Sequence, residues 1–302
     1  LTHTRPRIEI GGVVEAIGEG VTKYKVGDSV GVGCFVDSCR SCNLCKCGEQ
    51  NYCRTGMVGT YNAKEKYPHC PGYSAEDPAP TYGGYSKDVV VHEDFVCKIP
   101  SHLDLAAATP LLCAGITVYS PMAHYGLKKG QRLAVAGLGG LGHMAVKFGL
   151  AWGCPVTVLS RGSAKKEEAM TRLGATAFID VTDAAAVKAA AESFDMIIDC
   201  IPAEHDLGLY LGMVDINGTM AVVGASPTPL PVHMFSLIAR RKSLVGSMIG
   251  GIKETQEMLD FCGKHNIVCD IEMIDAKAIN EAYERTIKSD VRYRFVIDTA
   301  TL

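Results

Sequence analysis

The sequence lacks several features that would assign it to a particular class of protein. Its formal net charge at pH 7 is only −3, so it has no excess of basic residues for binding nucleic acid or an acidic membrane surface. It contains no apolar run long enough to span a membrane. Internal repeats and low-complexity segments are also absent. We therefore expect neither nucleic-acid nor membrane partners.

The composition is that of a folded protein large enough for two domains. A length of 302 residues favours two domains with buried cores. Hydrophobic residues make up 47% and charged residues 21%, which is ordinary for a globular protein. The thirteen cysteines are an odd number, and most stand singly in apolar surroundings, such as Cys154, Cys200 and Cys262. This pattern predicts a reduced, cytoplasmic protein rather than a disulfide framework.

Four of the cysteines lie close together in a pattern that favours a metal site. Cys39, Cys42, Cys45 and Cys53 are spaced C-x2-C-x2-C-x7-C. Thiolates at such short intervals can bind one tetrahedral Zn²⁺ without help from distant parts of the fold, and four ligands leave no position open for water. The spacing therefore predicts a structural zinc site, and the chemistry must come from residues elsewhere.

The two ends of the chain have different sequence patterns. Residues 1–118 are rich in glycine, valine and short β-like runs, which predicts an antiparallel β domain with the cysteine cluster between strands. The prolines and glycines of 61–84 predict a long surface loop. From Gln131 onwards, apolar strand-like segments alternate with helix-like segments. This alternation predicts an α/β fold, a parallel sheet with helices on both faces.

A glycine-rich loop follows the first strand of this α/β part. It satisfies G-x-G-x-x-G between a predicted strand and a predicted helix, with the residues Gly137, Leu138, Gly139, Gly140, Leu141 and Gly142. The first glycine permits a tight turn, the second lets the backbone approach a pyrophosphate, and the third allows the strand and helix to pack closely. The helix N-terminus then faces the negative charge. In this context the loop predicts dinucleotide binding rather than a packing turn alone.

The end of the next strand indicates which dinucleotide is bound. Enzymes that use NAD usually place a carboxylate there for the ribose 2′-hydroxyl. Here the turn contains Ser160, Arg161 and Lys165, and no carboxylate occurs before Glu167. Hydroxyl, guanidinium and ammonium groups suit the 2′-phosphate of NADP(H), although a solvated basic turn before a helix has the same composition. We predict NADP(H).

These features together resemble the zinc-containing medium-chain alcohol dehydrogenases, and within them the NADP-dependent cinnamyl alcohol dehydrogenase group. The matching segments cover almost the whole chain in family order. They are VGDSVGVGC (26–34), the cysteine cluster through NYC (51–53), TYGGYS (81–86), TPLLCAGITVYSP (109–121), GLGGLGH (137–143), GSMIGGIKETQEMLDFC (246–262) and VRYRFV (291–296).

The resemblance implies a fold, a reaction and an assembly. It implies a GroES-like catalytic domain with the zinc lobe over 1–118, a Rossmann domain over 119–253, and a return to the catalytic domain over 254–302. It implies reversible hydride transfer between NADP(H) and an alcohol/aldehyde pair, of the cinnamyl type or another aromatic or aliphatic type. A catalytic Zn²⁺ polarises the substrate oxygen in this family. Family members are commonly homodimers, and we expect the same here.

The resemblance also implies site residues, and here the chain departs from the family. Cys113 matches a cysteine ligand of the catalytic zinc, and Glu9 matches a glutamate beside or on that metal. The histidine ligand falls at Ile8, which cannot coordinate a metal, and the upstream stretch that carries another cysteine ligand is missing. Two ligands fall short of the usual three. Together with leucine at position 1, this predicts an N-terminally truncated chain with an incomplete GroES-like domain and little activity.

Two other functions stay open. The chain can be a non-catalytic NADP(H)-binding protein that keeps only the structural zinc. It can also be a zinc-free NADPH reductase of the quinone-reductase type on the same fold, but the four-cysteine cluster argues against that. Metal content together with turnover separates the first alternative from an active enzyme.

Overall fold

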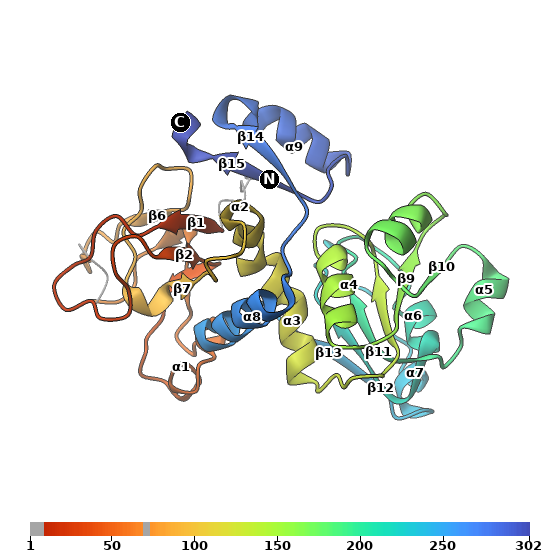
Figure 1. Ribbon diagram of the computed structural model, residues 1–302. Helices are drawn as coiled ribbons and strands as arrows, with labels where there is room; N and C mark the ends of the chain where they lie inside the picture. Colours follow the sequence, from red (N-terminus) through yellow and green to blue (C-terminus); the bar gives the residue numbers. More distant parts are fainter. Residues whose placement is uncertain (1–8, 69–72) are drawn as a thin grey trace. The chain divides into compact units, whose positions relative to one another are not determined.

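The computed structural model describes residues 9–68 and 73–302 and divides the chain into two compact units. The first unit is built from two segments, Leu1–Ile116 and Ile249–Leu302, and the second is Thr117–Met248. Figure 1 shows the second segment of the first unit in blue, together with the red and orange strands from the beginning of the chain. The first unit is therefore discontinuous in sequence, with the second unit inserted between its two segments.

The first unit contains several small sheets. Its strands are β1 (Ile10–Val13), β2 (Ser29–Val32), β3 (Phe35–Asp37), β4 (Val58–Gly59), β5 (Tyr61–Lys64), β6 (Pro80–Tyr82), β7 (Cys97–Lys98), β14 (Ile271–Asp275) and β15 (Arg294–Asp298). The strands β1, β2 and β7 form an antiparallel sheet in that order. The pairs β3–β4 and β5–β6 are antiparallel, and β14–β15 is parallel. The predicted antiparallel β structure is thus present in this unit.

The helices of the first unit are mostly short. They are α1 (Asn43–Lys46), α2 (Leu105–Ala108), α8 (Ile252–His265) and α9 (Ile279–Ile287), with single 3₁₀ turns at Gln50–Tyr52, Glu93–Phe95, Thr109–Leu112, Ala276–Ala278 and Thr299–Thr301. Asp104 caps α2 by accepting a hydrogen bond from the Ala107 N–H at 2.7 Å. The longest, α8, ends at His265, and the next residue, Asn266, has a φ of 52°. Asparagine tolerates this left-handed conformation, which stops a helix.

The prediction of a loop over 61–84 is only partly right. Strands β5 and β6 lie in this segment and pair with each other, with Tyr61 opposite Tyr82. The prolines concealed the second strand, since proline lacks the N–H that a sheet ladder uses. Pro80 is tolerated because it is the first residue of β6 in a sheet of two strands.

The second unit is built on one parallel sheet. Its strands are β8 (Leu133–Ala136), β9 (Val156–Ser160), β10 (Ala177–Asp180), β11 (Phe194–Asp199), β12 (Val214–Val222) and β13 (Ser243–Gly246). They lie in the order β10-β9-β8-β11-β12-β13 and all neighbouring pairs are parallel. The strand order reverses between β8 and β11. In such sheets, the loops that leave these two strands at their carboxyl ends diverge and form the ligand-binding crevice.

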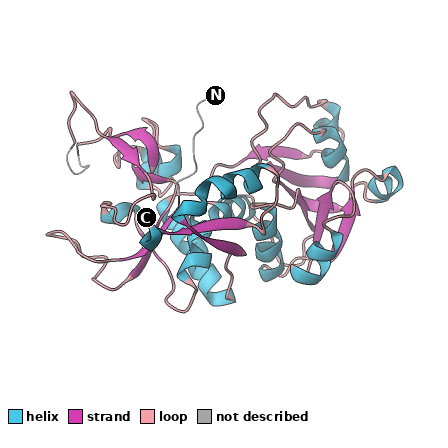
Figure 2. Ribbon diagram, turned by 90° about the horizontal axis from the view of Figure 1, so that it is seen from above, coloured by secondary structure: helices cyan, strands magenta, loops and turns pink. Residues whose placement is uncertain are grey.

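Helices cover both faces of this sheet. They are α4 (Gly142–Ala151), α5 (Ala184–Ala189), α6 (Leu207–Met213) and α7 (Phe235–Ile238), with a π-helical turn at Glu168–Arg172, while α3 (Ala114–His124) contains the boundary between the units. Figure 1 shows α4 and α6 on opposite sides of the sheet, and Figure 2 shows the magenta strands between cyan helices. Ile197 and Met220 of the sheet are wholly buried in one core cluster with Leu211 of α6. The predicted α/β arrangement is confirmed.

No helix within the two described ranges is, by itself, both long and apolar enough to cross a membrane. One bent pair, Leu105–Leu112 with Ala114–His124, meets the criterion by length and composition alone.

Candidate functional site

The glycine loop lies at the carboxyl end of β8, where the strand order reverses. Gly137 has a φ of 85°, which favours glycine. A Cβ on Gly142 would lie 2.0 Å from the Gly137 carbonyl oxygen, so only glycine lets α4 begin this close to the strand. A Cβ on Gly139, in contrast, would meet no atom within 4 Å. Gly142 is therefore needed for packing, whereas Gly139 faces open space in which a ligand has room to approach.

The turn after β9 is joined to this loop. The Lys165 ammonium donates a hydrogen bond to the Leu138 carbonyl oxygen at 2.6 Å. Arg161 is exposed and Ser160 is half-buried at the end of the strand. The structure thus brings the predicted basic turn and the predicted glycine loop into direct contact, with Arg161 exposed.

A carboxylate that the sequence pattern did not indicate lies beside this turn. Asp180 ends β10 and accepts hydrogen bonds from the Thr182 hydroxyl at 2.7 Å, the Thr182 N–H at 2.9 Å and the Gly162 N–H at 2.8 Å. These bonds, the Thr182 hydroxyl first, hold the pKa of Asp180 below its ordinary value. In the parallel register Asp180 pairs with Ser160. The parallel pairing of β9 and β10 explains why Asp180 lies beside the turn, because neighbouring parallel strands end at the same edge of the sheet.

The four clustered cysteines converge in the first unit. Their sulfur atoms all lie within 4.8 Å of one another. The Cys42 N–H donates to the Cys39 Sγ at 3.3 Å, and the Cys39 N–H donates to the Cys53 Sγ at 3.5 Å. Hydrogen bonds of this kind favour the thiolate, and the pKa of Cys39 is lowered to about 5, chiefly by the Cys42 N–H.

These four sulfurs fit a structural Zn²⁺. A short-range set of four thiols with N–H···S bonds is the donor set and outer shell that such sites use. Cys47 lies in the same lobe but is not part of the cluster. Its side chain is exposed, and its Sγ donates a hydrogen bond to the Leu44 carbonyl oxygen at 3.2 Å. Among the residues that the structure describes, no other group of three or more histidine, cysteine or acidic side chains converges in this way.

Cys113 and Glu9 lie together, beside two residues that the sequence pattern did not indicate. Burial raises the pKa of Glu9, whereas the positive charge of Arg294 and a hydrogen bond with Cys113 lower it. A hydrogen bond with Cys113, together with burial, raises the pKa of Cys34. Cys113 follows the 3₁₀ turn Thr109–Leu112, and β2 packs tightly on this turn, because a Cβ on Gly31 would lie 2.4 Å from the Leu112 Cδ1. This packing brings Cys34, which follows β2, to Cys113.

Among the described residues, this second group offers fewer converging ligands than a catalytic zinc normally uses. Catalytic sites normally use three protein ligands, and the ligand atoms of Cys113, Glu9 and Cys34 do not converge as those of the clustered cysteines do. Ile8, at the position expected for a histidine, lies outside the described residues.

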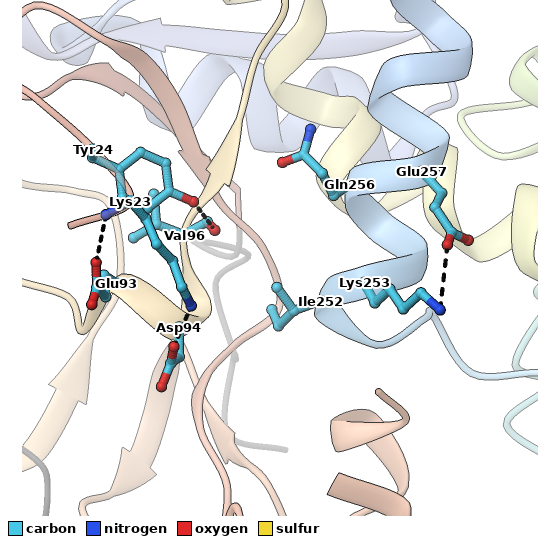
Figure 3. A pocket seen from close by; sticks show the side chains of 9 residues that line it. All are labelled: Lys23, Tyr24, Glu93, Asp94, Val96, Ile252, Lys253, Gln256 and Glu257. Carbon is cyan, nitrogen blue, oxygen red and sulfur yellow. Dashed lines mark hydrogen bonds and ion pairs between the residues drawn. The ribbon is translucent and has the colours of Figure 1, made fainter. Parts of the chain in front are cut away.

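A cavity of about 320 Å³ lies in the first unit, between the β structure and α8. Figure 3 shows the side chains that line it. Its charged side chains face one another: Lys23 pairs with Asp94, and Lys253 lies 3.9 Å from Glu257. The Tyr24 hydroxyl donates to the Val96 carbonyl oxygen at 2.6 Å. Because these groups satisfy one another, we assign no ligand to this cavity.

Comparison with known proteins connects both units to one family. The alcohol dehydrogenase GroES-like domain matches residues 4–101, and the zinc-binding dehydrogenase domain matches residues 140–264. NADP-dependent alcohol dehydrogenase C 1 of Mycolicibacterium smegmatis is 53% identical over 298 residues, which are 98% of this chain and 82% of that protein. Cinnamyl alcohol dehydrogenase 8 of Arabidopsis thaliana is 51% identical over 296 residues, 98% of this chain and 79% of that protein.

Solved structures give the same result. A cinnamyl alcohol dehydrogenase from Sorghum bicolor superposes with a TM-score of 0.90 at 49% identity, covering 96% of this chain and 80% of that one. The Helicobacter pylori enzyme complexed with NADP(H) superposes with a TM-score of 0.87 at 40% identity, covering 98% and 82%. The predicted family and fold class are confirmed. With a GroES-like unit, a parallel sheet that carries a glycine loop, and relatives of this identity over nearly its whole length, the chain belongs to the zinc-type medium-chain alcohol dehydrogenase family.

Proposed function

We propose that the chain binds NADP(H) and transfers hydride reversibly between this cofactor and an alcohol/aldehyde pair. The observation that carries the proposal is the turn after β9, where Arg161 and Ser160 lie at the strand end and Lys165 contacts the glycine loop. A guanidinium and a hydroxyl suit a 2′-phosphate, whereas the Asp180 carboxylate beside the turn already accepts hydrogen bonds from Gly162 and Thr182. The names of the relatives, which include NADP-dependent alcohol dehydrogenases, support this assignment.

The cofactor residues have separate roles in this proposal. The backbone of Gly137–Gly142 receives the pyrophosphate at the N-terminus of α4. Ser160 and Arg161 bind the 2′-phosphate, and Lys165 positions the loop through the Leu138 carbonyl oxygen. When bound, the nicotinamide supplies or accepts the hydride. Unit Thr117–Met248 is thus the cofactor-binding part of the chain.

We further propose that Cys39, Cys42, Cys45 and Cys53 bind one structural Zn²⁺. The convergence of their sulfur atoms and the lowered pKa of Cys39 support this. Four thiolate ligands leave no position for a substrate. The metal would therefore stabilise the lobe and take no part in hydride transfer.

The substrate class is the alcohol/aldehyde pair of the family, with cinnamyl-type and other aromatic or aliphatic aldehydes as candidates. Cys113 and Glu9 mark the part of the first unit that we assign to the substrate oxygen. Their hydrogen bond and the nearby charge of Arg294 make this a polar, partly buried place. The relatives include a cinnamyl alcohol dehydrogenase and a protein named as a probable formaldehyde dehydrogenase, so the assay should use both large and small aldehydes.

One observation favours a second candidate function. The ligand atoms around Cys113 and Glu9 do not converge among the described residues. In this second function, the chain is a protein that binds NADP(H) and one structural zinc and does not catalyse hydride transfer.

One experiment separates the two functions. Purified protein is analysed for zinc and assayed for NADPH oxidation with cinnamaldehyde and with formaldehyde. About two zinc ions per chain together with turnover support the dehydrogenase. About one zinc with saturable NADPH binding and no turnover supports the binding protein. Absence of NADPH binding contradicts both.

We also propose that the chain forms homodimers through the second unit. Strand β13 is at the edge of the sheet, and an edge strand offers unpaired backbone groups to a partner. Unit 117–248 also exposes apolar side chains, with Phe235 at 65% and Ile238 at 67% exposure. Light scattering after size-exclusion chromatography should give twice 32.3 kDa, and a monomer mass would contradict the proposal.

A cytoplasmic location completes the proposal. Cysteine ligands bind zinc only in the reduced state. None of the twelve cysteines in the described residues forms a disulfide bond, which suits a reducing compartment.

A further inference from the structure

The second unit contains a buried carboxylate–imidazole pair next to the glycine loop. Asp199 ends β11 and is wholly buried. The His205 Nε2 lies 3.0 Å from the Asp199 Oδ2, and the His205 side chain is 8% exposed. The other ring nitrogen, Nδ1, lies 2.7 Å from the Ala203 carbonyl oxygen. Both ring nitrogens therefore face oxygen atoms.

This geometry requires an additional proton. A carbonyl oxygen only accepts hydrogen bonds, so Nδ1 must carry a hydrogen to donate to Ala203. If Nε2 were unprotonated and Asp199 were ionised, two lone pairs would face each other at 3.0 Å. The pair thus holds one more proton, either as an imidazolium with a carboxylate or as an imidazole with a carboxylic acid. Burial raises the pKa of Asp199, against the hydrogen bonds and the His205 charge that lower it.

Two titratable side chains next to the pair, Cys200 and Tyr210, have pKa values raised above their ordinary values. Burial first, and then the Asp199 charge, raises the pKa of Cys200 and raises the pKa of Tyr210 to about 12. The Tyr210 ring packs edge-on against the His205 ring at 5.6 Å. Arg161 and Asp206 are the other charges that act on Tyr210. With the pKa of Cys200 raised and that of Tyr210 raised to about 12, the proton shared by Asp199 and His205 is the one that can leave.

The pair holds a loop that packs against the glycine loop. The Asp199 Oδ1 accepts a hydrogen bond from the Ile201 N–H at 3.0 Å. A Cβ on Gly137 would lie 3.0 Å from the Ile201 Cγ1, and a Cβ on Gly224 would lie 2.3 Å from the Ile201 carbonyl oxygen. Ile201 thus fits between two glycines with little space on either side. The Ile201 loop therefore lies directly against Gly137, the residue that sets the turn of the cofactor loop.

We propose that Asp199 and His205 are positioning residues whose shared proton holds the Ile201 loop against Gly137, so that NADP(H) binding requires this proton and weakens at alkaline pH. The inference rests on the proposed binding of NADP(H) at the glycine loop. The sign follows from linkage: if the cofactor binds the protonated form better, raising the pH favours release of both proton and cofactor. The 2′-phosphate loses its second proton near pH 6, and therefore stays fully charged in the alkaline range.

Asp199→Asn separates this role from a merely structural one. The asparagine amide has the shape of the carboxylic acid. Its oxygen accepts from the Ile201 N–H, and its NH₂ donates to the neutral His205 Nε2. The variant thus keeps both hydrogen bonds without a proton to lose. His205→Gln is a second variant, because its amide also donates to Asp199 without titrating near neutral pH.

The experiment measures the dissociation constant of NADPH by fluorescence between about pH 7 and about pH 10. For the wild type, we expect it to rise with pH by up to about tenfold per unit, the limit for one proton. The dissociation constant of Asp199→Asn should show no such rise with pH, whatever its value at neutral pH. Asp195→Asn is the matched control: Asp195 is on the same strand, but its carboxylate pairs with Arg132 at 2.7 Å, so the wild-type pH dependence should persist.

Three results would overturn the inference: a wild type without pH dependence, an Asp199→Asn variant with native circular dichroism and the full wild-type dependence, or a flat Asp195→Asn profile. If Asp199→Asn does not fold, His205→Gln takes its place and should again give a flat profile. Failure of the wild type to bind NADPH at any pH instead contradicts the proposed function, so the two failures are distinguishable.

Discussion

At the scale of single residues, the glycines of the cofactor loop have different physical roles. Gly142 is glycine because any Cβ would lie 2.0 Å from the Gly137 carbonyl oxygen. Gly139 has no such neighbour. Its small size matters only when a ligand approaches the backbone. The two positions can therefore be separated by experiment.

Gly139→Ala should weaken NADPH binding and leave the melting temperature unchanged, because its Cβ occupies only space intended for the ligand. Gly142→Ala should instead destabilise the second unit by about 1–3 kcal/mol, the usual cost of overpacking. Thermal unfolding and an NADPH titration of both variants test this. A Gly139→Ala protein with wild-type affinity would show that the pyrophosphate binds elsewhere.

Arg161→Ala should discriminate between the two dinucleotides. Loss of a charged hydrogen bond of about 1.5–3 kcal/mol corresponds to NADPH binding weakened by about tenfold to a hundredfold, with NADH binding nearly unchanged. Lys188→Ala, on the exposed side of α5, is the control cation and should change neither. Equal losses for NADPH and NADH would mean that Arg161 does not contact the 2′-phosphate.

Some site residues could be predicted from the sequence and others could not. The glycine loop and the cysteine cluster are local patterns, so spacing alone indicates them. Asp180 and Asp199 reach the cofactor side of the sheet only through the strand register and the strand order. Cys34 meets Cys113 through packing between segments 79 residues apart in sequence. Contacts of this kind depend on tertiary structure, which a single sequence does not display.

At the scale of elements, the zinc lobe is the clearest case of a local pattern that folds as predicted. The four thiols lie in a segment of fifteen residues, Cys39 to Cys53, and converge around a helix of a single turn, α1. So short a helix is not stable by itself in water. A bound metal would hold the lobe together.

Cys42→Ser should therefore release the zinc and lower the melting temperature of the first unit, since serine replaces a thiolate with a poor ligand. Cys47→Ser is a matched control in the same lobe and should keep both the metal and the stability. Metal analysis by mass spectrometry and thermal unfolding measure the two effects. Full zinc content in Cys42→Ser would contradict the four-cysteine site.

The start of α8 depends on the same lobe. A Cβ on Gly251 would lie 1.6 Å from the Gly48 carbonyl oxygen, and the Ile252 N–H donates to the Gln50 Oε1 at 3.2 Å. Gly251→Ala should destabilise the protein by at least about 1–3 kcal/mol. Gly12→Ala in β1, where a Cβ meets nothing within 4 Å, should be nearly neutral. Urea unfolding compares them, and equal stability of the two variants would contradict this packing.

Elements defined by long apolar or periodic segments were predictable, whereas weak strands were not. The apolar strands of the second unit give a clear alternation with helices, and the structure has the parallel sheet expected from it. The pair β5–β6 was expected to be loop, because Pro80 conceals a strand of three residues. Whether so short a segment forms a strand depends on the segment that pairs with it across the sheet.

At the scale of the whole molecule, the two units contain different functional residues. The second unit contains every residue that we assign to NADP(H), including the Asp199–His205 pair. The first unit contains the cysteine cluster and the group around Cys113. Cofactor binding can therefore be measured independently of any metal near Cys113. The order of the segments along the chain predicted the family, and the comparisons confirm it.

The most direct test of the central claim is an equilibrium titration of the purified chain with NADPH and with NADH at one salt concentration. The change in fluorescence of the bound reduced dinucleotide follows the binding. We predict saturable binding of NADPH that is at least about tenfold tighter than that of NADH, the difference expected for one charged contact to the 2′-phosphate. Equal affinity for the two dinucleotides, or no binding of NADPH, would contradict the account.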